Sequence, residues 1–165
     1  MTLKGLIDWY MKKTESPYMH RIAAGGIVIN VRKILLVRYR DGESTYLVAP
    51  GGGIKDGESL ASAAEREVEE ETGVKCKAKT PVMIENIRAT RYQMVKVWYQ
   101  CEYIRGAPSL TIGAEEEGII EVGWYTDDEL CHETVFPEII QTLEIDSLVN
   151  LRGEIIDPGV RYAHF

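Results

Sequence analysis

The fold is decided by one stretch of sequence, GGIKDGESLASAAEREVEEETGV, which runs from residue 52 to residue 74. Residues 59–72 predict a helix, because Ser59 is a suitable N-cap and Gly73 stands where a left-handed glycine ends a helix. Apolar residues recur every four positions and predict the buried stripe of this helix: Leu60, Ala64 and Val68.

Three glutamates of this helix predict a metal site. Glu67, Glu70 and Glu71 stand at i, i+3 and i+4, so their side chains project from one face and repel one another. Such hard oxygen ligands suit Mg²⁺ or Mn²⁺, and a cation would relieve the repulsion. Arg66 can pair with Glu58 or with Glu67 and so orient a carboxylate. The alternative is that the acidic run is only the solvated face of a helix.

The glycines before the helix add to this prediction. Residues 50–53 read Pro-Gly-Gly-Gly, which we expect no regular element to accommodate. The glycines allow a tight turn into the helix, and the carbonyl of Gly51 or Gly52 can become a further metal ligand.

The rest of the chain predicts strands interspersed with helices. Strands are expected at residues 22–29, 33–39, 45–49, 82–88, 93–103 and 119–125, and further helices at 127–131 and 137–148. This order predicts an α/β sandwich with a mixed β-sheet between helical layers.

One domain accounts for all 165 residues. We expect an N-terminal helical extension at 1–19, a core at 20–150 and a C-terminal tail at 151–165. The N-terminal helix is expected to pack on its own domain, with a contact in a homodimer as the alternative.

Composition excludes several classes of protein. The net charge of −7 argues against general nucleic-acid binding, which needs a cationic surface. Three distant cysteines indicate neither a zinc site nor a disulfide framework and predict free thiols in a reducing cytoplasm. The sequence MTLKGLIDWYMKK contains no apolar run of membrane-span length, so we expect no membrane association and a cytoplasmic location.

The glutamate-rich segment resembles the Nudix box, G-x5-E-x7-R-E-U-x-E-E-x-G-U with U aliphatic, and the chain is identified as similar to MutT-like Nudix hydrolases. Nine residues fill the stipulated positions: Gly52, Glu58, Arg66, Glu67, Val68, Glu70, Glu71, Gly73 and Val74. The resemblance extends over about residues 20–145 and implies a Nudix-type α/β/α sandwich.

The resemblance also implies roles for these residues. Glu67, Glu70 and Glu71 would bind Mg²⁺, for which Mn²⁺ can substitute, with the carbonyl of Gly51 or Gly52 as a further ligand. Arg66 and Glu58 would orient the ligands. A water would attack one phosphorus, helped by Glu71 or by a glutamate outside the box.

Many family members supply the outside glutamate from a loop before a tryptophan-bearing strand. Here that loop offers three glutamates, of which Glu117 or Glu116 is favoured over Glu115. The alternative is an acidic, solvent-exposed loop.

Positive partners for the substrate phosphates are expected on neighbouring strands. The candidates are Arg38, Arg40, Arg88 and Arg91. Alternation along the strand puts Arg38 and Arg40 on one face and Tyr39 on the other. Aromatic residues that can stack on a base are Tyr39, Tyr46, Tyr92 and Trp98, although ordinary packing is the alternative for each.

The resemblance implies Mg²⁺-dependent hydrolysis of the diphosphate linkage of a nucleoside diphosphate derivative, with release of a nucleoside monophosphate. A proline that often marks ADP-ribose pyrophosphatases is replaced by Ala89 and Thr90, whereas Tyr92 lies near a tyrosine typical of diadenosine polyphosphate hydrolases. Nucleoside triphosphates or dinucleoside polyphosphates are therefore favoured as small-molecule partners. The alternative substrates are ADP-ribose and nucleotide sugars.

Two other classes share this fold. A nucleotide-binding module without catalysis usually lacks box glutamates, and all are present here. An isopentenyl diphosphate isomerase needs a cysteine before the box, but no cysteine precedes Cys76.

Overall fold

The computed structural model describes residues 19–90, 92–151 and 155–162, so the predicted N-terminal helix and Arg91 lie outside the described residues. The strands are β1 (Met19–Asn30), β2 (Lys33–Asp41), β3 (Ser44–Val48), β4 (Gly51–Gly53), β5 (Lys75–Arg88), β6 (Tyr92–Arg105), β7 (Ile119–Tyr125), β8 (Val135–Phe136) and β9 (Val160–Tyr162). The helices are α2 (Leu60–Thr72), α3 (Ile112–Glu116), α4 (Asp127–Leu130), α5 (Ile139–Thr142) and α6 (Ile145–Val149).

The strands form one mixed sheet in the order β8-β3-β2-β1-β6-β5-β9, with β4 paired to β1 and β7 paired to β2. β1 runs parallel to β6 along almost its whole length, but it pairs with β2 only at Ile29 and Asn30, next to their connecting turn. β4 takes the place beside β1 that β2 leaves, and this arrangement brings the glycine segment against the centre of the sheet.

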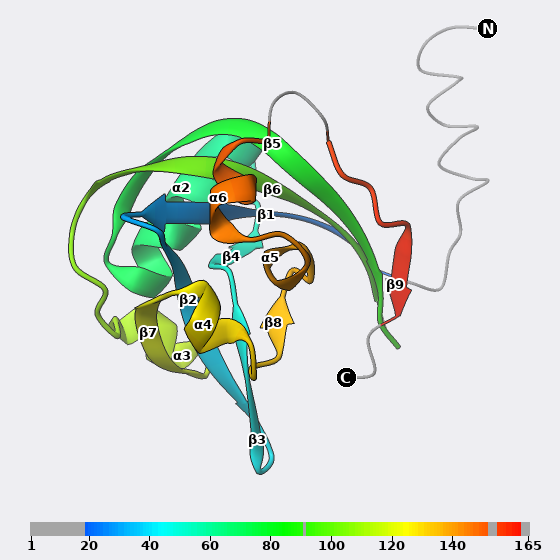
Figure 1. Ribbon diagram of the computed structural model, residues 1–165. Helices are drawn as coiled ribbons and strands as arrows, with labels where there is room; N and C mark the ends of the chain where they lie inside the picture. Colours follow the sequence, from blue (N-terminus) through cyan, green and yellow to red (C-terminus); the bar gives the residue numbers. More distant parts are fainter. Residues whose placement is uncertain (1–18, 91, 152–154, 163–165) are drawn as a thin grey trace, which may run out of the picture.

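Helices cover both faces of this sheet, as Figure 1 shows, with α2 on one side and α5 and α6 on the other. Residues of β1 alternate between the two layers. Ala24 packs against Ala63 and Ala64 of α2, whereas Ile27 belongs to the larger core that contains Ile140 of α5. The predicted α/β sandwich with a mixed sheet between helical layers is confirmed.

The expectation that residues 50–53 fit no regular element is wrong. Gly51–Gly53 form β4, which pairs antiparallel with residues 23–25 of β1. The glycines permit this because the two backbones lie unusually close. A Cβ atom on Gly51 would stand 2.4 Å from the Cα of Gly25.

Gly25→Ala is expected to destabilise the fold by about 3 kcal/mol, because overpacking a filled core forces its neighbours to move. The added Cβ would lie 2.3 Å from Cζ3 of Trp98 and 2.9 Å from the carbonyl oxygen of Pro50. Gly53→Ala is the matched control, since its Cβ would meet nothing within 4 Å. Urea denaturation compares the two, and equal losses of stability in both variants would contradict this account.

The predicted single helix at 137–148 is also wrong. α5 ends at Thr142, and Leu143 is extended with φ −115° and ψ 132° before α6 begins at Ile145. The Oδ1 atom of Asp127 accepts a hydrogen bond from the amide of Ile145 at 3.1 Å. A partner from another segment thus satisfies the start of a separate helix.

The strand expected at 82–88 begins earlier, at Lys75, and a short helix, α3, lies where an acidic loop was the alternative. The strand predicted at 119–125 has the predicted bounds.

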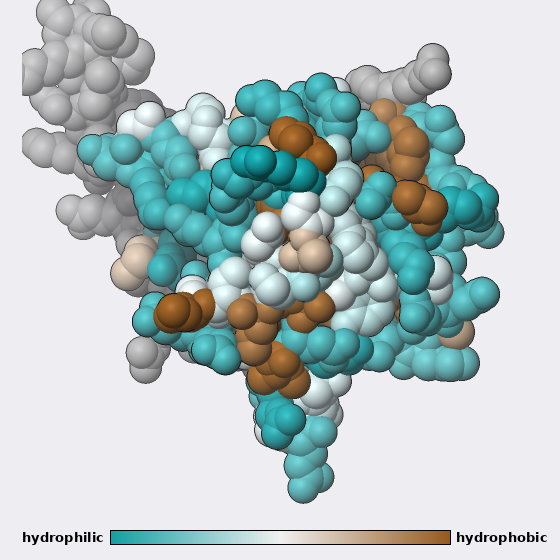
Figure 2. Space-filling model, turned by 90° about the vertical axis from the view of Figure 1, so that its left-hand side faces the viewer, coloured by the Kyte–Doolittle hydropathy of each residue, from teal (hydrophilic) through white to brown (hydrophobic). Residues whose placement is uncertain are grey.

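On the face drawn in Figure 2, apolar side chains of the described residues lie in separate patches among hydrophilic ones. No described helix has the length and apolar character needed to cross a membrane. The homodimer stays a prediction.

Candidate active site

Helix α2 carries the carboxylates of the site and is capped at both ends as the sequence predicts. The Oγ atom of Ser59 accepts a hydrogen bond from the amide of Ser62 at 3.1 Å, and Gly73 has a φ of 72°. Within this helix Glu67 and Glu71 are only 5% and 1% exposed. Two buried carboxylates one helical turn apart are costly unless positive charge accompanies them.

A third carboxylate, from Glu117, forms a cluster with Glu67 and Glu71. One oxygen from each of the three lies within 4.8 Å of the other two. Glu117 follows α3, and Thr111 at the start of α3 donates a hydrogen bond from its hydroxyl to a backbone carbonyl of α2. Of the two glutamates favoured from the sequence, the structure brings Glu117 to the box glutamates and leaves Glu116 exposed outside this cluster.

The cluster has unbalanced negative charge. Burial raises the pKa of Glu71 to about 8, and the charges of Glu67 and Glu117 contribute to the rise, although Lys96 opposes it. Burial also raises the pKa of Glu67, against the effect of Arg66. Three carboxylates that lie this close together, two of them buried, fit a hard divalent cation, which would offset their mutual repulsion.

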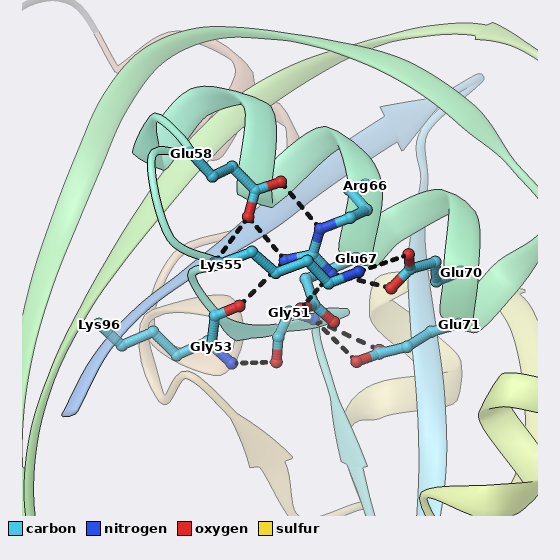
Figure 3. A network of polar contacts seen from close by, with 9 residues as sticks. All are labelled: Gly51, Gly53, Lys55, Glu58, Arg66, Glu67, Glu70, Glu71 and Lys96. Carbon is cyan, nitrogen blue, oxygen red and sulfur yellow. Dashed lines mark hydrogen bonds and ion pairs between the residues drawn. The ribbon is translucent and has the colours of Figure 1, made fainter.

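Arg66 ties the glutamates of the box together (Figure 3). Its guanidinium donates to both oxygens of Glu58 at 2.8 and 2.9 Å, to Glu67 at 2.6 Å and to Glu70 at 2.8 Å. It also donates to the carbonyl of Gly53 at 3.0 Å. The Arg66 guanidinium lowers the pKa of Glu58 to about 2. Both pairings that the sequence left open for Arg66 therefore occur, and they fix the orientation of Glu67.

Glu70 stands apart from the carboxylate cluster. Its side chain is 48% exposed and accepts hydrogen bonds from Lys55 at 3.1 Å and from Arg66 at 2.8 Å. Its role as a metal ligand stays a prediction.

Strand β4 lies directly on the buried carboxylates. The amide of Gly51 donates to both oxygens of Glu71 at 3.3 Å, and a Cβ on Gly52 would stand 2.7 Å from Oε2 of Glu67. On the other side of the strand, Lys96 donates from Nζ to the carbonyl of Gly51 at 2.7 Å. Lys96 is 7% exposed, and it was not predicted as a site residue from the sequence.

A cavity of about 580 Å³ lies beside this glycine strand. It is lined by β4 and Ile54, by the first residues of β1, and by Met94 and Lys96 of β6. Substrate atoms in this cavity would therefore lie next to the box.

Arg38 forms ion pairs with two glutamates outside the carboxylate cluster. Its guanidinium donates to Glu133 at 2.9 and 3.0 Å and to Glu121 at 3.0 Å. Burial raises the pKa of the next residue, Tyr39, and the charges of Glu71 and Glu117 contribute to the rise.

The other predicted substrate residues lie on separate strands. Arg40 and Arg88 are exposed on β2 and β5. The guanidinium of Arg21 lies 5.3 Å from the ring centroid of Tyr92. Arg88 and Tyr92 lie near each other beside the turn between β5 and β6, because Arg88 pairs with Gln93, whereas Arg40 is on β2. The roles of these residues in substrate binding stay predictions.

Comparison with known proteins places this site in a family. The model of the NUDIX domain matches residues 19–143. Nudix hydrolase 6 of Arabidopsis thaliana is 41% identical over 63 residues, which cover 35% of this chain and only 22% of the plant protein.

Solved structures share the fold. A MutT NUDIX hydrolase from Burkholderia pseudomallei has 25% sequence identity and a TM-score of 0.61, over 74% of this chain and 95% of that one. An ADP-ribose pyrophosphatase from Streptococcus suis 89-1591 has 20% identity and a TM-score of 0.59, over 90% of this chain and all (100%) of that one. With the family match spanning strands β1 to β8, the box helix and the carboxylate cluster, the chain belongs to the Nudix hydrolase family.

Proposed function

We propose that this protein hydrolyses the diphosphate linkage of a nucleoside diphosphate derivative in a Mg²⁺-dependent reaction and releases a nucleoside monophosphate. The observation that carries the proposal is the cluster of Glu67, Glu71 and Glu117 against the backbone of β4. Family membership supports the same reaction class, although family alone does not identify a substrate.

The residues that would hold Mg²⁺, or Mn²⁺ in its place, are Glu67, Glu71 and Glu117, with Glu70 and the carbonyl of Gly52 as further predicted ligands. Bound there, the ion would offset the negative charge that develops on the phosphate oxygens. Arg66 keeps Glu67 in one orientation through a 2.6 Å hydrogen bond.

A glutamate of the cluster would accept the proton of the attacking water. Glu71 and Glu117 are the two candidates. Glu71 is held by the amide of Gly51 and is 1% exposed, whereas Glu117 is exposed and can meet water directly. This difference favours Glu117 over Glu71 as the base.

For the substrate we retain nucleoside triphosphates and dinucleoside polyphosphates as the favoured class. ADP-ribose and nucleotide sugars are the alternative, supported by the likeness of the fold to the Streptococcus suis ADP-ribose pyrophosphatase. The cavity beside β4 is large enough for a nucleoside, since ligand pockets commonly measure about 300–1,000 Å³.

A substrate panel with Mg²⁺, resolved by chromatography, tests the proposal. It contains nucleoside triphosphates, dinucleoside polyphosphates, ADP-ribose and nucleotide sugars, each with and without EDTA. We expect one class to be cut by the native protein and not by Glu67→Gln, because that variant loses a carboxylate of the cluster.

The matched control is Glu69→Gln on the same helix, whose carboxylate pairs with Lys75 and is 49% exposed. It should retain native turnover. Hydrolysis that survives both EDTA and Glu67→Gln would refute the metal-dependent reaction. Nucleotide binding without turnover would support a non-catalytic binding domain instead.

A further inference from the structure

The C-terminal segment adds a strand to the sheet beyond the part that the family model covers. The match ends at residue 143, whereas β9 begins at Val160 and runs parallel to β5. The amide of Ile156 donates to the carbonyl of Val82, and the amide of Ile84 donates back to Ile156, both at 2.9 Å. This docking brings Arg161 alongside β5.

Arg161 reaches a buried carboxylate on β5. Its Nε atom lies 3.4 Å from Oε1 of Glu85, whose side chain is 3% exposed. The other oxygen of Glu85 accepts a hydrogen bond from Nε1 of Trp98 at 2.6 Å. The guanidinium also lies 4.7 Å from the ring centroid of Phe136, which packs it in place.

Lys96 is the second cation beside Glu85. The two residues are directly opposite each other on β5 and β6 and therefore share one face of the sheet. Nevertheless, the Nζ atom of Lys96 lies 4.2 Å from the ring centroid of Trp98 and donates to the carbonyl of Gly51. Figure 3 shows Lys96 extended toward Gly51, on the side of β4 opposite Glu71.

Glu85 and the carbonyl of Gly51 thus compete for one ammonium group. A buried carboxylate without a cation is strongly unfavourable, more so than a carbonyl that loses one hydrogen bond. If Arg161 did not pair with Glu85, the ammonium group of Lys96 would move from the carbonyl of Gly51 toward the carboxylate of Glu85. The amide of Gly51 contacts Glu71, so a displaced Gly51 would disturb the carboxylate cluster.

We propose that Arg161 is a positioning residue: by pairing with Glu85 it leaves Lys96 on the carbonyl of Gly51 and so fixes β4 against the carboxylate cluster. This inference rests on the proposed hydrolase function. It gives the C-terminal strand a role in the reaction, although β9 pairs with β5 at the edge of the sheet and not with the strand of the box.

A double-mutant cycle tests the proposal. Arg161→Met is expected to lower kcat at least about tenfold with little change in KM, because small displacements of a site can cost about a hundredfold in rate. The double variant Arg161→Met/Glu85→Gln should have the same kcat as Glu85→Gln alone, because residue 85 then carries no negative charge to attract Lys96. Arg161→Lys should retain most of the native kcat.

The control on the same strand is Tyr162→Ser, whose side chain is 64% exposed, and it should leave kcat unchanged. A raised KM with unchanged kcat in Arg161→Met, without rescue by Glu85→Gln, would overturn the proposal and indicate direct contact with substrate. Unchanged kinetics in Arg161→Met would overturn it as well.

Tryptophan fluorescence supplies a readout that needs no substrate. In a Trp9→Phe/Trp124→Phe background Trp98 is the remaining tryptophan. Arg161→Met should change its emission because Lys96 leaves the ring, and Arg161→Lys should not. If the native protein cuts nothing in the panel, the proposed function fails, and unchanged Trp98 emission in Arg161→Met would separately overturn the positioning of Lys96.

Discussion

Glu71→Gln is expected to lower kcat by about a thousandfold, the scale on which losing one preorganised electrostatic contact slows an enzyme. Glu71 is the most buried carboxylate of the cluster. Its oxygens accept from the amide of Gly51, and one of them lies within 4.8 Å of oxygens of Glu67 and Glu117. Glutamine has the same shape and still accepts the hydrogen bond from Gly51. The loss would therefore come from the missing charge.

The same variant should be at least as stable as the native protein without metal at alkaline pH. The folded-state pKa of Glu71 is raised to about 8 from an ordinary value of 4.5, so the unfolded chain releases this proton first. The native, metal-free protein therefore loses stability as the pH rises from about 4.5 to about 8. Glutamine does not ionise and escapes this loss.

Urea denaturation in EDTA across this pH range, together with kcat in Mg²⁺, measures both effects. The stability difference should vanish well below pH 4.5, where Glu71 is protonated in both states. A Glu71→Gln variant that is active, or that is less stable than the native protein at pH 8.5, would show that this carboxylate serves the fold and not the reaction.

Arg66→Ala is expected to lower both activity and stability. Kcat should fall by about a hundredfold, the upper range for residues that orient metal ligands. The free energy of unfolding should fall by about 3 kcal/mol, as is usual when one partner of a buried ion pair is removed. The cause is that Glu67, whose side chain is 7% exposed, loses its cationic partner.

Arg66→Lys separates charge from geometry, because lysine keeps the cation but lacks the planar fork that bonds both oxygens of Glu58. It should lose about tenfold in kcat. Lys75→Ala is the control, since it breaks an exposed ion pair with Glu69 at the end of the same helix. Equal kcat in Arg66→Ala and Lys75→Ala would remove Arg66 from the orienting role.

The box helix was predictable from sequence because its signals are local. Ser59 and Gly73 cap it through bonds within one or two turns, and Arg66 reaches Glu70 across one turn. Most strands were likewise indicated by runs of apolar residues, as with β7. Such patterns do not depend on partners far along the chain.

The remaining features depend on distant contacts. Glu85 and Lys96 sit at polar positions of alternating strands, which normally face solvent, yet both are buried. Glu85 pairs with Arg161 of the C-terminal segment, and Lys96 bonds the carbonyl of Gly51. The sequence cannot reveal that pairing without the sheet order. The division into α5 and α6 similarly depends on Asp127, which lies 18 residues before Ile145.

The glutamate outside the box shows the same limit. Sequence spacing left Glu116 and Glu117 as equal choices, because neighbouring residues differ only in direction. The direction is set where Thr111 bonds α3 to the backbone of α2, a contact between residues 41 apart. The local sequence pattern therefore identified the segment that supplies the glutamate, whereas the tertiary contact between α3 and α2 determines which glutamate faces the cluster.

The parallel pairing of β1 with β6 also has a consequence during synthesis. Met19 pairs with Tyr92, so the two partners are 73 residues apart in the chain. At about 5–20 residues per second, roughly 4–15 s separate their emergence from the ribosome. Until then β1, whose residues 23–28 are buried in the folded protein, can pair only with β2 at residues 29–30 and with β4 at residues 23–25. The time between synthesis of β1 and synthesis of β6 therefore sets how long the unpaired edge of β1 can pair with other nascent chains.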